Sequence, residues 1–456
     1  MDGTAQLLAT YAKGLQYTDL TAGAIHAAKR SIVDSMGCAL AALATPPMKA
    51  LCAVASRVSA TTPATVIGTQ IRTSPEWAAL VNGSLVRCLD FSDDYFGGNA
   101  DVGPHPSDNI GSIMAAVESA ELDCKALLLG TVLTYEIGGR LTDHFSIYRK
   151  GWDYTILHAI STSLAAGRVL DFSIEQMRNA LGIAVVSNVA LAETRHGDIS
   201  NWKGIAGPNA SRSGLTAALL AREGITGPSA PFEGHAGLMK QLNHSFALGI
   251  FGGPGIPFKI EGTFFKNFPV RYETQLPIEI ALDVRRNVKL DEIASISVFT
   301  EGSSVVDRVS NPKLWDPMSR ETADHSAPYL IAAALVDGAI SGETFTPQRY
   351  RDKVILALTD KIRIAEDPEY TASFPGSMNC RFEITLKSGA ALVVHRENPK
   401  GHPANAMTDR DLNAKFMQLV GPILGTGRSH ELLDVLWRLE QLKDMTPLFS
   451  LARVPN

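Results

Sequence analysis

Apolar residues recur every three or four positions over most of the chain between Thr18 and Leu248, in Ala- and Leu-rich stretches that Gly, Pro or capping residues interrupt. This spacing places apolar side chains on one side of an α-helix. The pattern predicts several helices in this part: 24–43, 76–89, 125–140, 173–186 and 209–223. Ser173 and Gln176 match a capping box, in which the serine oxygen accepts a backbone N–H and the glutamine bonds back to the cap.

After the Gly- and Pro-rich stretch Gly249–Phe258 the pattern changes. Three short segments alternate polar and apolar residues, as strands do: 295–299, 361–365 and 381–387. The third segment is the clearest strand, with apolar residues on one face and polar residues on the other. Ser388 and Gly389 then supply a turn into a further alternating segment, which predicts a β-hairpin.

Helical spacing returns at three places in the second half of the chain: 325–337, 411–420 and 430–442. The order is therefore helical, then mixed, then helical again. Two domains explain this order most simply if the last helices pack back on the first ones. The sequence predicts a mainly α protein with a large all-helical domain from both chain ends, residues 1–265 and 405–456, and an inserted smaller α+β domain, residues 266–404.

The amino-acid composition excludes several classes of protein. Of 456 residues, 45% are hydrophobic and 20% are charged, as in soluble globular proteins. Lys and Arg total 42 and Asp and Glu total 47, so no positive field favours nucleic acid as a partner. The scattered cysteines form no C-x-x-C pair, and no apolar run reaches the roughly 18 to 20 residues of a membrane span. We expect a cytoplasmic protein without a membrane partner or an export signal.

Several common sites are excluded by their motifs. The sequence contains no H-E-x-x-H, no G-x-x-x-x-G-K-[ST] and no G-x-S-x-G. The glycines of 251–258 do not follow a strand and open a helix, so a dinucleotide site is not supported. The cysteine spacing gives no reason to expect an iron–sulfur cluster.

A dense polar stretch from Leu89 to Asn109 is the first candidate site. It gathers acids around one histidine: Asp90, Asp93, Asp94, Asp101, His105 and Asp108. Neighbouring acids favour the imidazolium form of a histidine, which is the form that a general acid needs. Two alternatives remain for these acids, namely helix caps with solvated turns, and a carboxylate metal site, although no acid pair has a recognised ligand spacing.

Three further stretches combine a charged or titratable residue with aromatic or hydroxyl neighbours. Lys203 follows a tryptophan in NWKG, and Lys266 lies between aromatic residues in FKNFP. His325 stands with Ser326 and Tyr329 at the predicted start of a helix in ADHSAPY. Each has a structural alternative, because lysine stems often pack on aromatic rings and a histidine at a helix start often caps it.

Taken together, these stretches resemble the MmgE/PrpD family, whose members include 2-methylcitrate dehydratase, cis-aconitate decarboxylase and iminodisuccinate epimerase. The resemblance rests on segments in register along nearly the whole chain: LDFSDD, HPSDN, GWDYTILHAI, NWKGIAGPNASRSG, FKNFPVRYETQ and RETADHSAPYLIAAALVDG. It implies that the inserted α+β domain is a lid, that the active site lies in the cleft between the domains, and that the protein is a homodimer. It implies no metal and no organic cofactor.

The resemblance also transfers residues by motif. The implied catalytic residues are Asp90, His105, Lys203, Lys266 and Tyr329. The implied substrate-binding residues are Asp94, Ser107, His158, Arg212, His325 and Gln275. For His158 the match is weaker, because the local pattern differs, and a core helix histidine is at least as good an interpretation. Asp94 replaces a threonine that is usual in the family, which leaves the substrate open, although Gln275 and the HPSDN segment favour the 2-methylcitrate dehydratase branch.

The resulting hypothesis is a cofactor-independent lyase on a small di- or tricarboxylic acid, similar to 2-methylcitrate dehydratase, that removes a proton alpha to a carboxylate. Lys203 and Lys266, with Arg212 as a third cation, would hold the carboxylates and neutralise the developing charge. Asp90 and His105 would supply the acid and the base, with Tyr329 assisting. The alternatives are cis-aconitate decarboxylation, epimerisation of iminodisuccinate, and, outside the class, a non-catalytic carboxylate-binding or scaffold protein.

Overall fold

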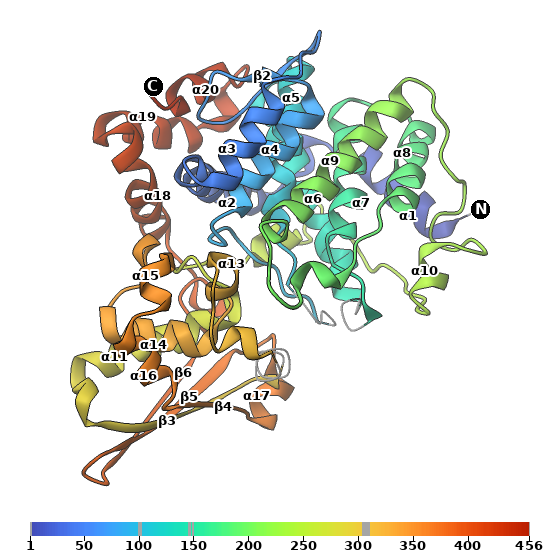
Figure 1. The fold of residues 1–456 in the computed structure, drawn as a ribbon. Helices are drawn as coiled ribbons and strands as arrows, with labels where there is room; N and C mark the ends of the chain where they lie inside the picture. The colour runs from blue at the N-terminus through green and yellow to red at the C-terminus, as the bar shows by residue number, and fades with distance from the viewer. Residues whose placement is uncertain (1, 99–102, 145–146, 148–149, 303–310, 456) are drawn as a thin grey trace. The chain divides into compact units, whose positions relative to one another are not determined.

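The computed structural model describes residues 2–98, 103–144, 147, 150–302 and 311–455 (Figure 1). Asp101 of the polar stretch lies outside these residues. The chain divides into two compact units. The helical unit comprises Met1–Ala192, Gly204–Thr263 and Thr408–Asn456, and the mixed unit comprises Glu193–Lys203 and Phe264–Met407. Helices predominate over small sheets, which confirms the prediction of a mainly α protein.

Several helices of the helical unit fall in or overlap the predicted ranges. The unit contains α1 Gly3–Gly14, α2 Ala22–Ala42, α3 Pro46–Ala55, α4 Pro75–Arg87, α5 Ile110–Ser119, α6 Cys124–His144, α7 Ile156–Val169, α8 Ile174–Ser187, α9 Lys203–Arg222, α10 Leu238–Gln241, α18 Asp409–Leu424, α19 Thr426–Leu436 and α20 Thr446–Ala452. The predicted capping box of α8 is confirmed, because Ser173 accepts from the Gln176 N–H and Gln176 accepts from the Ser173 N–H. In the described residues no single helix has the length and hydropathy of a membrane span. The helices α2 and α3, joined at a sharp bend, reach that length and hydropathy only when they are taken together.

Helices α4 and α5 approach each other closely through glycines. A Cβ atom on Gly111 would lie 2.4 Å from the backbone nitrogen of Gly83, which no side chain could tolerate. This contact brings the segment that follows α4 and the segment that precedes α5 together. Both segments belong to the polar stretch 89–109, so helix packing itself positions that stretch.

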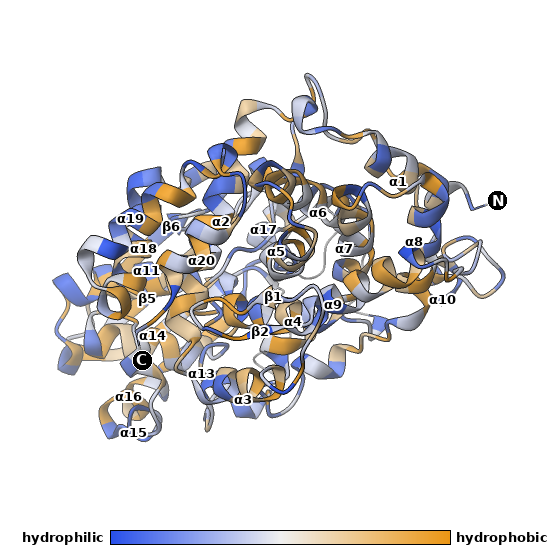
Figure 2. Cartoon of the chain, turned by 90° about the horizontal axis from the view of Figure 1, so that it is seen from above, coloured by the Kyte–Doolittle hydropathy of each residue, from blue (hydrophilic) through white to orange (hydrophobic). Residues whose placement is uncertain are grey.

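Helix α18, in the C-terminal part of the chain, packs against α2 and so joins the helical unit. Its buried positions include Leu412, Phe416 and Val420, which follow the spacing of one helix face. Hydrophilic residues occupy other positions along α18 (Figure 2). A single buried charge, Lys415, lies among the apolar residues of this face and contacts the site described below.

The mixed unit contains a four-stranded sheet in the order β4-β3-β5-β6. Its strands are β3 Ile293–Thr300, β4 Ile362–Glu366, β5 Asn379–Leu386 and β6 Ala391–Glu397. β3 pairs in parallel with β4 and antiparallel with β5, and β5 pairs antiparallel with β6. The predicted hairpin is therefore confirmed, and Gly389 in its turn adopts a positive φ of 87°.

The mixed unit also contains six α-helices in its described residues. They are α11 Gln275–Asn287, α13 Arg320–Ala323, α14 Ala327–Asp337, α15 Pro347–Tyr350, α16 Lys353–Thr359 and α17 Pro368–Ser373. One buried cluster joins α11, α14 and α16 to the inward residues of β5, such as Phe382 and Ile384. In Figure 1 these three helices lie together along one side of the sheet.

The structure departs from the predictions in three places. The helical unit also holds a two-stranded antiparallel pair, β1 Ala64–Thr65 with β2 Arg72–Thr73, so it is not all-helical. Two residues per strand are too few to show an alternating pattern. Helix α9 begins at Lys203 instead of residue 209, and the helix predicted over 430–442 is α19 with a separate short turn, Leu439–Gln441.

The first turns of α9 contain two residues that usually interrupt a helix. Gly207 and Pro208 resemble helix-breaking residues in the sequence, yet both lie inside the helix. A Cβ atom on Gly207 would lie 2.0 Å from a carboxylate oxygen of Asp108. The glycine is thus required by the close approach of α9 to the polar stretch.

Candidate functional site

The polar stretch of the helical unit is organised by an arginine that the sequence analysis did not single out. Arg87 is the last residue of α4 and is 2% exposed. Its Nη1 donates to Asp90 Oδ1 at 2.8 Å. Asp90 has a positive φ of 52°, a conformation that aspartate tolerates better than most residues and that turns the chain sharply after the helix.

The second arm of the same guanidinium donates to His105. Arg87 Nη2 lies 2.8 Å from His105 Nε2, and His105 Nδ1 lies 2.7 Å from the backbone oxygen of Asp93. A guanidinium group and a carbonyl oxygen have fixed roles as donor and acceptor. Nε2 must therefore accept and Nδ1 must carry the hydrogen, so His105 is held as the neutral imidazole. We call Arg87, Asp90, Asp93, Asp94 and His105 the Arg87 cluster.

This geometry corrects the expectation that the acids around His105 favour its imidazolium form. Asp94 does approach the ring, with Oδ2 3.5 Å from Nδ1. The cation on Nε2 opposes its effect, because an imidazolium could not accept that hydrogen bond. Burial alone would lower the pKa of Arg87, but Asp90 and further carboxylates raise it, so the guanidinium stays charged. The signal that the sequence offered was an Arg and an Asp three residues apart at a helix end.

Asp93 is buried and hydrogen-bonded from two sides. Tyr135 of α6 donates to Oδ2 at 2.5 Å, and the Ser107 N–H donates to Oδ1 at 3.2 Å. Burial raises the pKa of Asp93 to about 6, and the hydrogen bonds from Ser107 and Tyr135 offset part of that effect. Ser107, a predicted substrate-binding residue, thus positions Asp93 through its backbone.

A buried lysine supports the same loop from the C-terminal part of the helical unit. Lys415 Nζ lies 2.7 Å from Asp34 Oδ1 and donates to the Phe91 backbone oxygen at 2.7 Å. It also lies 3.9 Å from the centre of the Phe91 ring. Phe91 directly follows Asp90, so this contact fixes the loop that carries the Arg87 cluster.

His158 of α7 lies in a second buried group beside the polar stretch. Thr162 donates to Asn109 Oδ1 at 2.8 Å, which orients the amide so that Asn109 Nδ2 donates to His158 Nδ1 at 3.1 Å. The other ring nitrogen, Nε2, faces Asp108 Oδ2 at 3.6 Å. His158 is therefore a buried helix histidine with defined polar partners and not one packed only against apolar residues.

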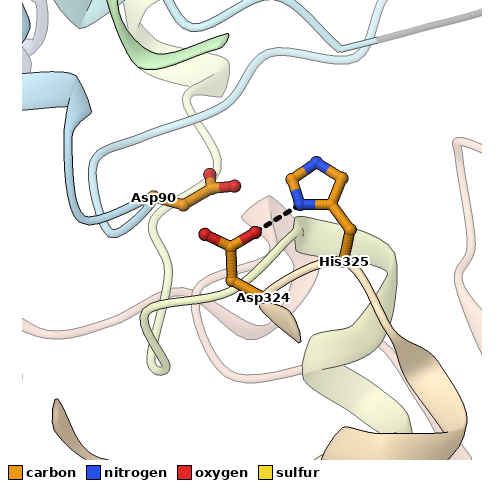
Figure 3. Close-up of side chains that lie close together, drawn as sticks. All are labelled: Asp90, Asp324 and His325. Atoms are coloured by element: carbon orange, nitrogen blue, oxygen red, sulfur yellow. Dashed lines mark hydrogen bonds and ion pairs between the residues drawn. The ribbon is translucent and has the colours of Figure 1, made fainter. Parts of the chain in front are cut away.

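In the mixed unit the carboxylate of Asp324 joins two predicted residues. Lys203 Nζ donates to Asp324 Oδ1 at 2.9 Å and to Oδ2 at 3.1 Å. His325 Nδ1 lies 2.5 Å from Asp324 Oδ1, the contact drawn as a dashed line in Figure 3. We call Lys203, Asp324 and His325 the Asp324 cluster. Figure 3 also draws Asp90, which belongs to the helical unit.

Lys266 is completely buried, with 0% exposure, in the segment that opens the mixed unit. The preceding residue, Phe265, donates its N–H to the Gly401 oxygen at 3.0 Å. A Cβ atom on Gly401 would lie 2.0 Å from the Phe265 oxygen, and its φ is +97°, so only glycine fits there.

Gln275 holds the other side of the Lys266 segment. Its Oε1 accepts from the N–H groups of Asn267 at 3.0 Å and Phe268 at 2.9 Å. Its Nε2 donates to the oxygens of Phe268 at 2.9 Å and Val270 at 3.4 Å. The whole amide is thus used by backbone groups, which favours a structural role for Gln275 over the predicted contact with substrate.

Two other predicted residues have structural surroundings. Tyr329 lies in the core of the mixed unit, where its hydroxyl donates to the Thr344 oxygen at 2.5 Å and its ring packs edge-on against Tyr350. Burial, the largest cause, raises its pKa. Arg212, on α9, stacks its guanidinium over the Trp77 ring at 5.8 Å. The motifs did not indicate these packing contacts of Tyr329 and Arg212.

The structure thus groups the predicted residues unit by unit. Asp90, Asp94, His105 and Ser107 come together in the helical unit, and Lys203 and His325 come together in the mixed unit. The motifs did not indicate the residues that bind these side chains or their loop within each unit: Arg87, Tyr135 and Lys415 in the helical unit, and Asp324 in the mixed unit. The roles assigned to the predicted residues, and the cleft expected between the domains, stay predictions.

A mainly α chain with buried carboxylates, histidines and lysines has the groups that acid–base chemistry on a charged substrate requires. Two family models match it: the MmgE/PrpD N-terminal domain over residues 6–249 and the MmgE/PrpD C-terminal domain over residues 268–441. The chain belongs to the MmgE/PrpD family, which confirms the resemblance seen in its motifs.

Curated relatives are named as lyases of two kinds. Cis-aconitate decarboxylase of Mus musculus is 26% identical over 472 residues, which cover 97% of this chain and 92% of the relative. A 2-methylcitrate dehydratase of Escherichia coli O157:H7 is 29% identical over 373 residues, which cover 75% and 74%. The mitochondrial 2-methylcitrate dehydratase of Yarrowia lipolytica is 28% identical over 418 residues, which cover 83% and 76%.

Proposed function

We propose that the protein is a cofactor-independent lyase that acts on a small di- or tricarboxylic acid, as a hydro-lyase of the 2-methylcitrate dehydratase kind. Membership of the MmgE/PrpD family and the names of the relatives support a lyase. The geometry adds buried polar clusters of the composition that proton abstraction next to a carboxylate requires.

The observation that carries the proposal is the burial of two lysines in the mixed unit. Lys203 is 2% exposed and Lys266 is 0% exposed. A buried ammonium group stabilises a neighbouring negative charge far more strongly than one in water, because the local dielectric constant is low. The substrate carboxylates and the carbanion formed next to them carry such charge. We therefore assign both lysines to carboxylate binding, Lys203 in addition to its ion pair with Asp324.

In the proposed reaction a base removes the proton from the carbon alpha to a carboxylate, and the electron pair spreads into that carboxylate. The hydroxyl group on the adjacent carbon then leaves with a proton as water, and the double bond forms. Asp90 and His105 are the acid–base pair indicated by the motifs. His105 can exchange a proton at Nε2 only when Arg87 gives up its hydrogen bond there.

Cis-aconitate decarboxylation is the second candidate, and one observation favours it. The alignment with the mouse decarboxylase covers 97% of this chain, whereas the one with the Escherichia coli dehydratase covers 75%. In that reaction the bond to a carboxylate breaks, carbon dioxide leaves and a proton takes its place. The carbanion is common to both reactions, so the lysines serve either one.

A substrate panel tests the proposal. The purified protein is incubated with 2-methylcitrate, citrate, cis-aconitate and iminodisuccinate, while ultraviolet absorbance and carbon dioxide release are followed. We expect water loss from 2-methylcitrate, and a fall of about 10²-fold or more in kcat/KM for Lys266→Met, which removes a charge stabiliser. Lys353→Met, at an exposed lysine, is the matched control.

Two other outcomes of the substrate panel would change the proposal. Release of carbon dioxide from cis-aconitate replaces the first candidate by the second. Thermal stabilisation by one of the acids without turnover would identify a non-catalytic carboxylate-binding protein and overturn the proposal.

A further inference from the structure

We propose that Asp324 is a positioning residue that holds His325 with its Nε2 as a proton acceptor, while Lys203 balances the charge of the carboxylate. The cluster lies entirely within the mixed unit. The assignment of this acceptor to the reaction rests on the proposed function, whereas the state of the ring does not. It adds a base to the acid–base pair that the motifs indicated.

The shortest contact decides the form of His325. Nδ1 lies 2.5 Å from Asp324 Oδ1, whereas Lys203 Nζ lies 3.4 Å from the same nitrogen. Lys203 bonds to both oxygens of Asp324, which is the pattern of an ionised carboxylate. An ionised carboxylate only accepts, so Nδ1 carries the hydrogen and donates it to Asp324. In the neutral ring Nε2 is then the acceptor.

Backbone bonds hold Asp324 and His325 in place. Asp324 donates its N–H to the Arg320 oxygen at 2.9 Å, and its own oxygen accepts from the Arg271 N–H at 3.0 Å. The next residue, Ser326, caps α14 by accepting from the Tyr329 N–H at 3.2 Å. The pair therefore lies between two helix ends, which fixes the direction of the imidazole. In Figure 3 the Nε2 side of the ring points away from Asp324.

The other charged groups near the pair also have bonding or stacking partners. The Arg271 side chain bonds to Glu273 through Nε at 2.7 Å. The Arg320 guanidinium stacks over the Phe345 ring at 4.5 Å, and Glu321 accepts from Asn201. The phenol of Tyr350 faces the group as a neutral hydroxyl, since burial, the largest cause, raises its pKa to about 12. Within the mixed unit, Lys203 and Asp324 contact the ring directly.

This arrangement suits proton abstraction. The proton from the carbon alpha to a substrate carboxylate moves to Nε2, and its electron pair stays on the substrate. The resulting imidazolium donates from Nδ1 to Asp324, whose negative charge stabilises it. The hydroxyl group on the adjacent carbon then leaves with the proton taken up at Nε2, so that the substrate loses one molecule of water in total and His325 returns to its neutral form.

Nitrogen NMR of the full chain tests the form of the ring without any substrate. In protein labelled with ¹⁵N in its histidines, the signals that disappear in His325→Gln identify His325. We expect a protonated Nδ1 and an unprotonated Nε2 above the pH at which the ring becomes charged. A hydrogen on Nε2 with an unprotonated Nδ1 would overturn the proposal.

Kinetics test the role of the carboxylate. Asp324→Asn removes the charge and keeps the shape, so we expect kcat to fall about 10²-fold or more and the acidic limb of kcat/KM to move to lower pH. Glu321→Gln, which removes a charge three residues away, should change kcat less than about twofold. An Asp324→Asn enzyme with the wild-type pH profile would overturn the proposal.

The two proposals fail in different ways. A wild-type protein without turnover on the whole panel rejects the proposed function, while the NMR result still decides the form of His325. An active wild type with an unchanged Asp324→Asn variant rejects the role of Asp324 alone. Where the variant does not fold, the NMR measurement on the wild type decides.

Discussion

In the helical unit His105 is bonded by a cation, whereas in the mixed unit His325 is bonded by an anion. Arg87 donates to Nε2 of the first histidine and so keeps that ring neutral. Asp324 accepts from Nδ1 of the second and so favours a ring that gains a proton. The same residue type thus lies in two electrostatic environments, because a neighbouring cation disfavours the protonated ring and a neighbouring anion favours it.

The buried carboxylates of the two units also differ in their bonding partners. Asp90 and Asp324 are each bonded to a buried cation, Arg87 and Lys203 respectively. Asp93 instead accepts from a tyrosine and a backbone N–H, and burial raises its pKa to about 6. Asp90 and Asp93 thus lie three residues apart in one stretch yet have different bonding partners, Arg87 for the first and Tyr135 with the Ser107 N–H for the second.

The largest expected effect follows removal of the cation of the helical unit. Arg87→Ala leaves Asp90 buried without its guanidinium partner, and the free energy of unfolding should fall by about 3–5 kcal/mol. Denaturant titration measures the change. Arg57→Ala, at an exposed arginine, is the control and should stay within about 0.5 kcal/mol of the wild type. An equal, small effect of both substitutions would mean that Arg87 does not organise the cluster.

A pH-dependent effect should follow at Asp93. A raised native pKa means that the folded protein binds the proton more tightly than the unfolded chain, so this group destabilises the fold as pH rises from about 4 through about 6. Over this range the wild type should lose about 2–3 kcal/mol relative to Asp93→Asn. Unfolding titrations at both pH values measure it, and Asp291→Asn, at an exposed acid, should show no such difference. A parallel response of the wild type and Asp93→Asn would contradict the raised pKa of Asp93.

The smallest expected effect concerns Tyr329, where the structural and the predicted catalytic roles diverge. Tyr329→Phe removes one hydrogen bond to the Thr344 oxygen, so stability should fall by about 1 kcal/mol and kcat by less than about threefold. Tyr350→Phe removes a comparable bond, to the Phe345 oxygen at 2.7 Å, and is the matched control. A loss of about 10²-fold in kcat for Tyr329→Phe alone would restore its catalytic role.

Local features were predictable from the sequence. The capping box of α8 and the hairpin β5–β6 depend on residues only a few positions apart, so their signals are complete within a short window. The change from helical to alternating spacing likewise marked the mixed unit. The two-residue strands β1 and β2 were missed because two residues cannot show an alternating pattern. The start of α9 was missed because it contains a glycine and a proline, which usually interrupt helices.

The sequence by itself determined which residue types are present for chemistry, since motifs carry Asp90, His105, Lys203, Lys266 and His325 in a recognisable order. Only the tertiary structure decided which partners these side chains bond to and where their protons lie. Lys203 and Asp324 are 121 positions apart, and Asp34 is joined to Lys415 from the other end of the chain. A proton's position depends on charges within a few ångströms, and those distances are set by how the helices pack, which no single stretch of sequence contains.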